Sequence, residues 1–316
     1  MNSQSRESVE GRRFLVTGGA GFIGSHIVGA LIDNGAKVAV LDDFSNGRES
    51  NLPTGSPALE LFSGDVRTFN FDTLGKVDGV FNEAARALLP SFEDPLTDVT
   101  VNAGGTARVL EYARKCHSRV IHASSGSVYG NPVRIPISED HPVRPISPYG
   151  VSKLASEYYC LMYKNEFGVD VTILRYFNVY GPRQTVSEEM GVIPIFVKRA
   201  LAGQPLRVFG DGKQTRDFLN VSDVVRANLL AFNANASGSI MNIGGGGQEI
   251  SILELAKKVS NLCGSRSEVV SAPPKPGDIR RLAADSSRAR DLVGYTPKVS
   301  IDEGLRSYID YTKSKS

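Results

Sequence analysis

A tyrosine and a lysine four residues apart carry a clear chemical signal in this chain. Tyr149 and Lys153 fall at the start of a helix-forming stretch that Ser147 can cap, with Pro148 in its first turn. The spacing puts the phenol and the ammonium on one helix face. A neighbouring ammonium, with the positive charge of an oxidised nicotinamide, would stabilise the phenolate and lower the tyrosine pKa from its usual ~10. The pair could then take a hydroxyl proton while a hydride leaves the same carbon, although alone it is more often a half-exposed helix face.

Small hydroxyl side chains lie upstream, in the segment SSGSVYG at Ser124–Gly130. This segment follows a buried strand predicted over Arg119–His122, so it leaves the predicted sheet at its carboxyl edge. Ligands bind at that edge in open α/β sheets. A serine-rich loop is as often a solvated turn, so it supports a site only together with the tyrosine and lysine.

Glycines 18, 21 and 24 separate a predicted strand, Arg13–Thr17, from a helical pattern that ends before Gly35. Such glycines let the backbone turn sharply and approach a pyrophosphate, while the helix N-terminus points free N–H groups at the phosphates. A tight turn that binds nothing is the alternative.

An acidic residue, Asp42, ends the next predicted strand, Val38–Leu41. A carboxylate there can accept hydrogen bonds from both ribose hydroxyls of adenosine and would repel a 2′-phosphate, so the pattern favours NAD over NADP. Asp65 and Val66, after a further short strand, fall where the adenine edge would lie, although such a pair is also typical of a turn.

Short apolar strands alternate with helical stretches along the first half of the chain. Further strands are predicted at Gly79–Phe81 and Val169–Leu174, and helices at Asp98–Lys115 and Pro148–Phe167. We therefore predict an α/β fold, a Rossmann-type doubly wound parallel sheet with helices on both faces. Beyond Tyr180, shorter elements separated by Gly and Pro predict a smaller, discontinuous C-terminal α/β substrate lobe. The predicted NAD-binding domain covers residues 11–180 plus about 216–240, and the predicted nucleotide-sugar-binding lobe covers about 181–215 plus 241–316.

The composition excludes several classes of protein. The 316 residues are 41% hydrophobic and 22% charged with a net charge of +2, too balanced for nucleic-acid binding by counterion release. The three cysteines are far apart and lack zinc spacing, so we expect reduced thiols and no metal site. No apolar run approaches the roughly 18 residues of a membrane span, and the polar start does not resemble a signal peptide. We expect a cytoplasmic protein with no membrane or nucleic-acid partner.

Taken together, these segments resemble the extended short-chain dehydrogenase/reductases. Within them, the chain is similar to the nucleotide-sugar epimerase/dehydratase group and especially to the UDP-glucose 4-epimerases. The resemblance spans nearly the whole chain and rests on segments in the family's order: TGGAGFIG (17–24), LDDFSNG (41–47), GDV (64–66), SSGSVYG (124–130), SPYGVSK (147–153), LRYFNVYGPRQ (174–184), FGDGKQTRDFLNVSDV (209–224) and PGDIRRLAADSSRA (276–289).

The resemblance implies the site residues. The family's catalytic triad falls on Ser125, Tyr149 and Lys153. The implied cofactor, NAD, would be held by Gly18, Gly21, Phe22, Ile23, Asp42, Asp43, Phe44, Ser45, Asn46, Gly47, Asp65, Val66, Ala84, Ala85, Arg86, Asn102, Ser124, Tyr149, Lys153 and Phe177. The implied UDP-sugar substrate would be bound by Ser125, Tyr149, Asn178, Val192, Ile193, Arg207, Val208, Phe209, Arg216, Lys275 and Asp278.

The loop after Ser125 distinguishes the reactions of this family. Its dehydratases carry Asp-Glu beside the catalytic residue and its glucuronate decarboxylases carry Glu two residues after it, whereas this chain has Gly126 and Ser127. The resemblance therefore implies an isomerase that interconverts C4 epimers of a UDP-sugar (hexose, N-acetylated or uronate) through a transient 4-keto sugar. The alternatives are another NAD-dependent nucleotide-sugar enzyme (decarboxylase, dehydratase or reductase) and a non-catalytic NAD-sensing protein. A homodimer packed through the two predicted helices, 98–115 and 148–167, is also implied.

The chain departs from the family pattern near the cofactor. Asn82 stands where the family's H-x-A-A motif has histidine, and Glu83 and Arg86 add a charged pair. Lys275 replaces the arginine that many members have before PGD, and Leu282 matches a position that limits bulk near the sugar's C2 substituent. These departures bear on the sugar rather than on the fold.

Overall fold

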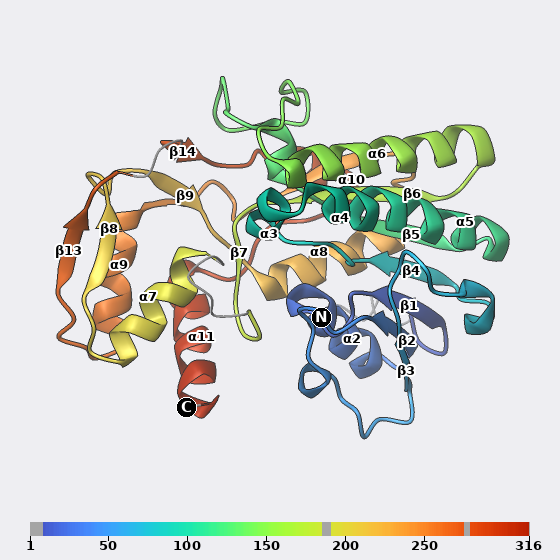
Figure 1. Cartoon of the computed structure of the whole chain (residues 1–316), viewed down its shortest axis with the longest axis horizontal. Helices are drawn as coiled ribbons and strands as arrows, with labels where there is room; N and C mark the ends of the chain where they lie inside the picture. The colour runs from blue at the N-terminus through green and yellow to red at the C-terminus, as the bar shows by residue number, and fades with distance from the viewer. Residues whose placement is uncertain (1–8, 185–190, 275–278, 316) are drawn as a thin grey trace.

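A seven-stranded parallel sheet forms the centre of the protein (Figure 1). The computed structural model describes residues 9–184, 191–274 and 279–315. The strands lie in the order β11-β6-β5-β4-β1-β2-β3, and all neighbours pair in parallel. Their bounds are β1 (Arg13–Thr17), β2 (Lys37–Asp42), β3 (Leu59–Ser63), β4 (Gly79–Asn82), β5 (Arg119–Ser125), β6 (Val171–Tyr176) and β11 (Ile240–Ile243). The order reverses between β1 and β4, where doubly wound folds bind ligands, and it confirms the predicted Rossmann-type architecture.

Helices cover both faces of this sheet (Figure 1). On one face lie α2 (Phe22–Asp33) and α8 (Val221–Asn233); on the other lie α3 (Leu88–Glu93), α4 (Pro95–Val99), α5 (Thr106–Cys116) and α6 (Pro148–Phe167). Successive side chains of a strand point to opposite faces, so Phe14 and Val16 join the core under α2 and α8. Leu15 joins the core under α5 and α6. Burial on both sides explains why these strands are continuous apolar runs rather than alternating ones.

Helix α6 begins and ends where the sequence predicts. The hydroxyl of Ser147 accepts a hydrogen bond from Gly150 N at 3.0 Å, which satisfies one of the free donors of the first turn. The helix closes at Gly168, whose φ of +69° suits glycine.

The helix predicted over Asp98–Lys115 is not one regular helix. Between α4 and α5 the chain forms a π-helical turn over Thr100–Gly105. Asn102 within this turn is fully buried, and its amide donates to Asp98 and Ser152. Wide turns of this kind place a side chain out of the regular helical register, often at functional sites, and side-chain periodicity does not reveal them.

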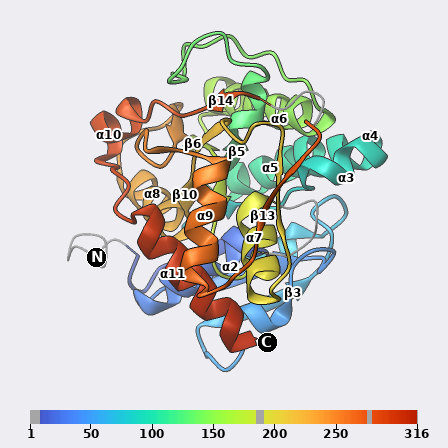
Figure 2. The same ribbon diagram turned by 90° about the vertical axis from the view of Figure 1, so that its left-hand side faces the viewer.

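A second layer lies beside the sheet, to the left in Figure 1 and facing the viewer in Figure 2. Its elements are α7 (Val192–Leu201), β8 (Leu206–Phe209), β9 (Thr215–Asp217), β12 (Glu249–Ser251), α9 (Ile252–Leu262), β13 (Val269–Ala272), β14 (Arg281–Leu282) and α11 (Ile301–Lys315), joined to the sheet through the short pair β7 (Val179–Tyr180) and β10 (Leu219–Asn220). It has its own core, in which Phe196, Leu255 and Leu305 meet from three helices. The predicted boundary between the NAD-binding domain and the smaller lobe at about residue 240 stays a prediction. Two elements that lie at or beyond this boundary in the sequence belong with the central sheet: β11 pairs with β6, and α10 (Ser287–Val293) packs on β11.

Within the described ranges, no helix has the length and apolar character needed to cross a membrane.

Candidate active site

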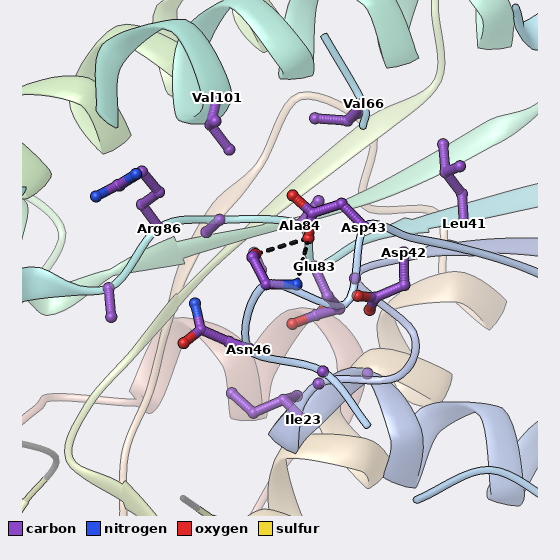
Figure 3. A pocket seen from close by; sticks show the side chains of 18 of the residues that line it. Ile23, Leu41, Asp42, Asp43, Asn46, Val66, Glu83, Ala84, Arg86 and Val101 are labelled. Carbon is purple, nitrogen blue, oxygen red and sulfur yellow. Dashed lines mark hydrogen bonds between the residues drawn. The ribbon is translucent and has the colours of Figure 1, made fainter. Parts of the chain in front are cut away.

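A cavity follows the carboxyl edge of the central sheet from β3 to β6 (Figure 3). The predicted cofactor residues that line it are Gly18, Gly21, Phe22, Ile23, Asp42, Asp43, Ser45, Asn46, Gly47, Asp65, Val66, Ala84, Ala85, Arg86, Ser124, Tyr149 and Lys153. Lining residues that the sequence did not indicate include Leu41, Arg67, Thr97, Val101 and Tyr176, and Glu83, predicted only to lie near the cofactor, also lines the cavity. The structure therefore brings the glycine turn, the acidic strand ends and the Tyr-Lys pair into one cavity.

The turn between β1 and α2 is tight enough to require its glycines. Gly18 has a φ of +65°, and a Cβ there would lie 2.8 Å from the main-chain nitrogen of Ala84. A Cβ at Gly24 would overlap the carbonyl oxygen of Gly18. Gly21 precedes α2, and no described side chain caps this helix N-terminus. Its first N–H groups border the cavity, an arrangement suited to binding phosphate.

Asp42 is fixed at the end of β2 by the backbone around it. Its carboxylate accepts hydrogen bonds from Ala20 N at 2.8 Å and from Phe44 N at 2.9 Å. A Cβ at Gly47 would come within 2.7 Å of the same carboxylate, so this loop also needs glycine. Burial raises the pKa of Asp42, and the two N–H donors oppose that rise. Its position agrees with the predicted ribose contact, which stays a prediction.

Asp65, after β3, is held by an ion pair with Arg67 at 2.5 Å, and this pair lowers the pKa of the Asp65 carboxyl. The two side chains border the end of the cavity that the sequence assigns to adenine.

Arg86 brings an unused donor to the cavity. Its main-chain N–H donates to the Asn102 side chain at 2.8 Å, which anchors the loop after β4. Its Nε is buried and has no hydrogen-bond partner among the described residues, and Figure 3 shows the side chain beside the cavity. A buried guanidinium donor and an uncapped helix N-terminus thus line the same cavity, and each suits an anionic ligand. The cavity therefore fits a dinucleotide pyrophosphate.

Two of the predicted catalytic side chains, Tyr149 and Lys153, line the cavity, and the third, Ser125, lies at the end of β5 beside Tyr149. Lys153 Nζ donates to the carbonyl oxygen of Ala123 at 2.8 Å and lies 5.9 Å from the centroid of the Tyr149 ring. The Tyr149 hydroxyl is within hydrogen-bonding reach of Ser125. Ser125 is further fixed because Ser127 N donates to its hydroxyl at 3.1 Å.

Burial dominates the ionisation of this group in the protein alone. It raises the pKa of Tyr149 to about 12, although the Ser125 hydrogen bond opposes the rise. It lowers the pKa of Lys153 to about 8. The expected lowering of the tyrosine pKa is therefore not met without the charge of a bound nicotinamide.

A buried ion pair between β6 and α6 contacts the segment Ser124–Gly130, which we call the serine loop, on the side away from the cavity. Arg175 on β6 and Glu157 on α6 pair at 2.6 Å, with side-chain exposures of 4% and 2%. Glu157 also accepts a hydrogen bond from Ser124 at 2.5 Å. The Ser124 hydroxyl therefore points toward Glu157, and what Ser124 offers the cavity is chiefly its backbone. The sequence carried one signal for this: Glu157 stands four residues after Lys153 on the same helix.

Glu83 is an additional acid in the same part of the cavity. It follows β4, and its carboxylate accepts a hydrogen bond from the Tyr176 hydroxyl at 2.9 Å. Burial raises its pKa to about 7, against the opposing effects of Tyr176 and Lys153. Its neighbour Asn82 is buried in a network with Thr17, Thr106 and His122, so an amide in place of the family's histidine is fully hydrogen-bonded.

A second cavity lies between the sheet and the smaller layer. The predicted substrate residues that line it are Asn178, Val192, Ile193, Arg207, Phe209 and Arg216, joined by Leu89, Gln184, Gln214 and Phe218. Arg216 Nη1 donates to the carbonyl of Ile279 at 2.7 Å, which orients its guanidinium. Tyr176 and Asn178, two residues apart, border the first and the second cavity.

Some predicted residues lie elsewhere. Val208, predicted to bind the substrate, does not line the second cavity. Its side chain is 4% exposed and packs in the core of the smaller layer, because alternate residues of β8 point inward. Asn102 and Phe177 are buried behind the cavity walls; Phe177 packs against Tyr129. Phe44 and Ser125 are not among the cavity-lining residues, although their neighbours are. The predicted Lys275 and Asp278 fall outside the described residues.

Comparison with known proteins agrees with this geometry. The sequence pattern described as the NAD dependent epimerase/dehydratase family matches residues 14–244. The chain belongs to this family. NAD is the cofactor of the family, which confirms the predicted cofactor.

Individual relatives are similar along nearly their whole length. A UDP-glucose 4-epimerase of Mycolicibacterium smegmatis is 41% identical over 314 residues, covering 96% of this chain and 99% of the relative. A UDP-glucuronic acid decarboxylase 1 of Xenopus tropicalis is 34% identical, covering 96% of this chain and 73% of the relative. The crystal structure of the Thermotoga maritima UDP-glucose 4-epimerase with UDP-glucose superposes with a TM-score of 0.90 at 37% identity, covering 96% and 99%. The family thus includes relatives with different named reactions.

Proposed function

We propose that this protein is an NAD-dependent UDP-sugar 4-epimerase. The observation that carries the proposal is that Tyr149 and Lys153 line the cofactor cavity and that Ser125, followed by Gly126 and Ser127, lies within hydrogen-bonding reach of Tyr149. A loop with no acid after Ser125 supports oxidation and reduction at one carbon without elimination. The UDP-glucose 4-epimerase relatives support the same reaction.

The proposed mechanism assigns one task to each side chain. Tyr149 takes the proton of the sugar C4 hydroxyl while Ser125 holds that hydroxyl by a hydrogen bond. Lys153, anchored on the Ala123 carbonyl, keeps a positive charge beside the phenol and favours its ionised form. Bound NAD supplies a hydride acceptor and later a hydride donor for C4. Tyr149 returns the proton after the 4-keto sugar has turned about its diphosphate link and presented its other face.

The second cavity is assigned to the UDP moiety. Arg216 and Asn178 would contact the diphosphate, and a guanidinium can hold two phosphate oxygens at once. Val192, Ile193, Arg207 and Phe209 would enclose uridine, because they form the apolar and basic wall of the same cavity.

The alternatives predict different products. A decarboxylase would release carbon dioxide, a dehydratase would release water, and a reductase would consume the reduced cofactor. A non-catalytic NAD sensor would have no use for a tyrosine held between a serine and a lysine.

The test is to incubate the protein separately with UDP-glucose, UDP-N-acetylglucosamine and UDP-glucuronate and identify the products by NMR. We expect a C4 epimer of unchanged mass from at least one of them and no net consumption of NAD. Loss of carbon dioxide or water, or stoichiometric cofactor turnover, would contradict the proposal.

We further propose a homodimer in the cytoplasm. Apolar side chains are exposed along α4 and α6, namely Leu96, Val99, Val151, Tyr158, Tyr159 and Met162. The two helices pack against one another, and exposed apolar side chains gathered on neighbouring elements are typical of interaction surfaces. Light scattering during gel filtration should give twice the chain mass, and a monomer at micromolar concentration would contradict the dimer.

A further inference from the structure

Glu83 is a carboxylate inside the cofactor cavity that the proposed mechanism does not use. It lies at the carboxyl end of β4, in the crevice where the strand order reverses, and Figure 3 shows it among the side chains that line the cavity. Its main-chain N–H donates to Thr17 O at 3.1 Å, so the residue is held at the edge of the sheet.

The hydrogen bonds around Glu83 suit both of its protonation states. Asn228 Nδ2 lies 2.8 Å from the Tyr176 hydroxyl oxygen, and that hydroxyl lies 2.9 Å from Glu83 Oε1. With Glu83 ionised, Asn228 donates to Tyr176 and Tyr176 donates to Glu83. With Glu83 protonated, the carboxyl can donate to Tyr176, whose proton then turns to Asn228 Oδ1 at 3.1 Å. Neither state leaves an unpaired donor, so the carboxyl can change charge without rearranging the backbone.

The surroundings of Glu83 bring the pKa of its carboxyl close to neutral pH. Tyr149 and Lys153 face it from α6 and Tyr176 from β6, while Asp98 on α4 acts on Tyr149 and Lys153. Burial raises the pKa of Glu83 to about 7, and the Tyr176 hydrogen bond and the Lys153 charge keep it from rising further.

We propose that the Glu83 carboxylate sets the preference of this cavity for the oxidised over the reduced nicotinamide. The inference rests on the proposed role of Tyr149, because the hydride acceptor must lie against the carbon whose hydroxyl Tyr149 deprotonates. Glu83 borders the same end of the cavity as Tyr149, Lys153 and Tyr176. An oxidised nicotinamide ring carries a positive charge and a reduced ring carries none, so a nearby carboxylate stabilises only the oxidised form.

This preference has a use in an epimerase. The reaction must return its hydride before the 4-keto sugar escapes, and a cavity that disfavours the reduced cofactor favours that return. A carboxylate beside Lys153 also offsets the ammonium, which by itself would repel the oxidised ring.

The test measures nucleotide binding without any sugar. The purified protein is equilibrated with defined mixtures of NAD+ and NADH from about pH 5.5 to about pH 8.5, and the bound nucleotides are extracted and quantified. In the unaltered protein, the preference for NAD+ should rise about tenfold as the pH increases through about 7, since tenfold corresponds to one pKa unit of differential interaction. Glu83→Gln should remove the contribution of the carboxylate to this rise. The contribution that remains belongs to Lys153, which loses its charge at a pKa of about 8 and then no longer repels the oxidised ring.

Two further variants separate electrostatics from loss of structure. Tyr176→Phe removes the hydrogen bond that stabilises the carboxylate, so the rise should move to higher pH. Glu93→Gln changes an exposed glutamate on α3 that does not line the cavity and should leave the profile unaltered. A pH-independent preference in the unaltered protein, an unchanged profile in Glu83→Gln, or an unmoved midpoint in Tyr176→Phe would each overturn the inference. Failure of the epimerase proposal would be seen separately, as absence of a C4 epimer.

Discussion

The ammonium of Lys153 lies 5.9 Å from the centre of the Tyr149 ring and is anchored by a 2.8 Å hydrogen bond to Ala123 O. The lysine therefore faces the phenol from a fixed point at the end of β5, the strand that also carries Ser125. One helix and one strand thus hold all three side chains of the proposed catalytic group. Their mutual geometry depends on how α6 packs against β5 and β6.

Replacing the phenol tests the proton transfer directly. Tyr149→Phe should lower kcat about a thousandfold, because general acid-base catalysis contributes rate factors of this order. Nucleotide binding should persist, since the aromatic ring stays in place. The measurement is steady-state kinetics with bound nucleotide quantified in the same sample. A full-rate variant would refute the assignment of Tyr149.

The glycine turn offers a matched pair of substitutions on one helix. Gly24→Ala should abolish NAD binding, because its Cβ would overlap the Gly18 carbonyl and push α2 away from β1. Gly29→Ala, at a position with no atom within 4 Å of the added Cβ, should retain NAD and stabilise the fold by about 0.5 kcal/mol. Nucleotide content after purification and thermal unfolding give the two readouts. Equal nucleotide content in the two variants would argue against phosphate binding at the turn between β1 and α2.

The buried ion pair behind the serine loop should be far more sensitive than an exposed one. Glu157→Gln leaves Arg175 buried without its counter-charge and should lower the free energy of unfolding by about 3 kcal/mol. Glu111→Gln, in an exposed pair with Arg114, should cost less than about 0.5 kcal/mol. Chemical denaturation measures both. A small effect at Glu157 would mean that the pair does not hold the loop after β5.

The sequence predicted the elements whose signals are local. Continuous apolar runs located β1 and β2, and Ser147 with Pro148 located the start of α6. The glycine turn and Asp42 were predicted as one site because their order along a strand-turn-helix-strand unit fixes their place at the sheet edge. These residues lie in one cavity.

Features that depend on distant contacts were not predictable in this way. The hydroxyl of Ser124 turns toward Glu157 rather than the cavity, a choice made by Arg175 on another strand. Val208 is buried because the opposite face of β8 looks into the cavity. The hydrogen bond from Tyr176 to Glu83 connects residues that are 93 positions apart in the sequence. Each of these placements depends on contacts between segments that are far apart in the sequence.

In the proposed reaction, the protein removes a hydride from C4 of a UDP-sugar and returns it to the same carbon. The most direct measurement uses UDP-glucose and UDP-N-acetylglucosamine with deuterium at C4, incubated in ordinary water and followed by NMR. We expect a C4 epimer to form from at least one of them with the deuterium retained at C4 and with no net reduction of added NAD. Loss of deuterium to the solvent, or a product that lacks water, would contradict it.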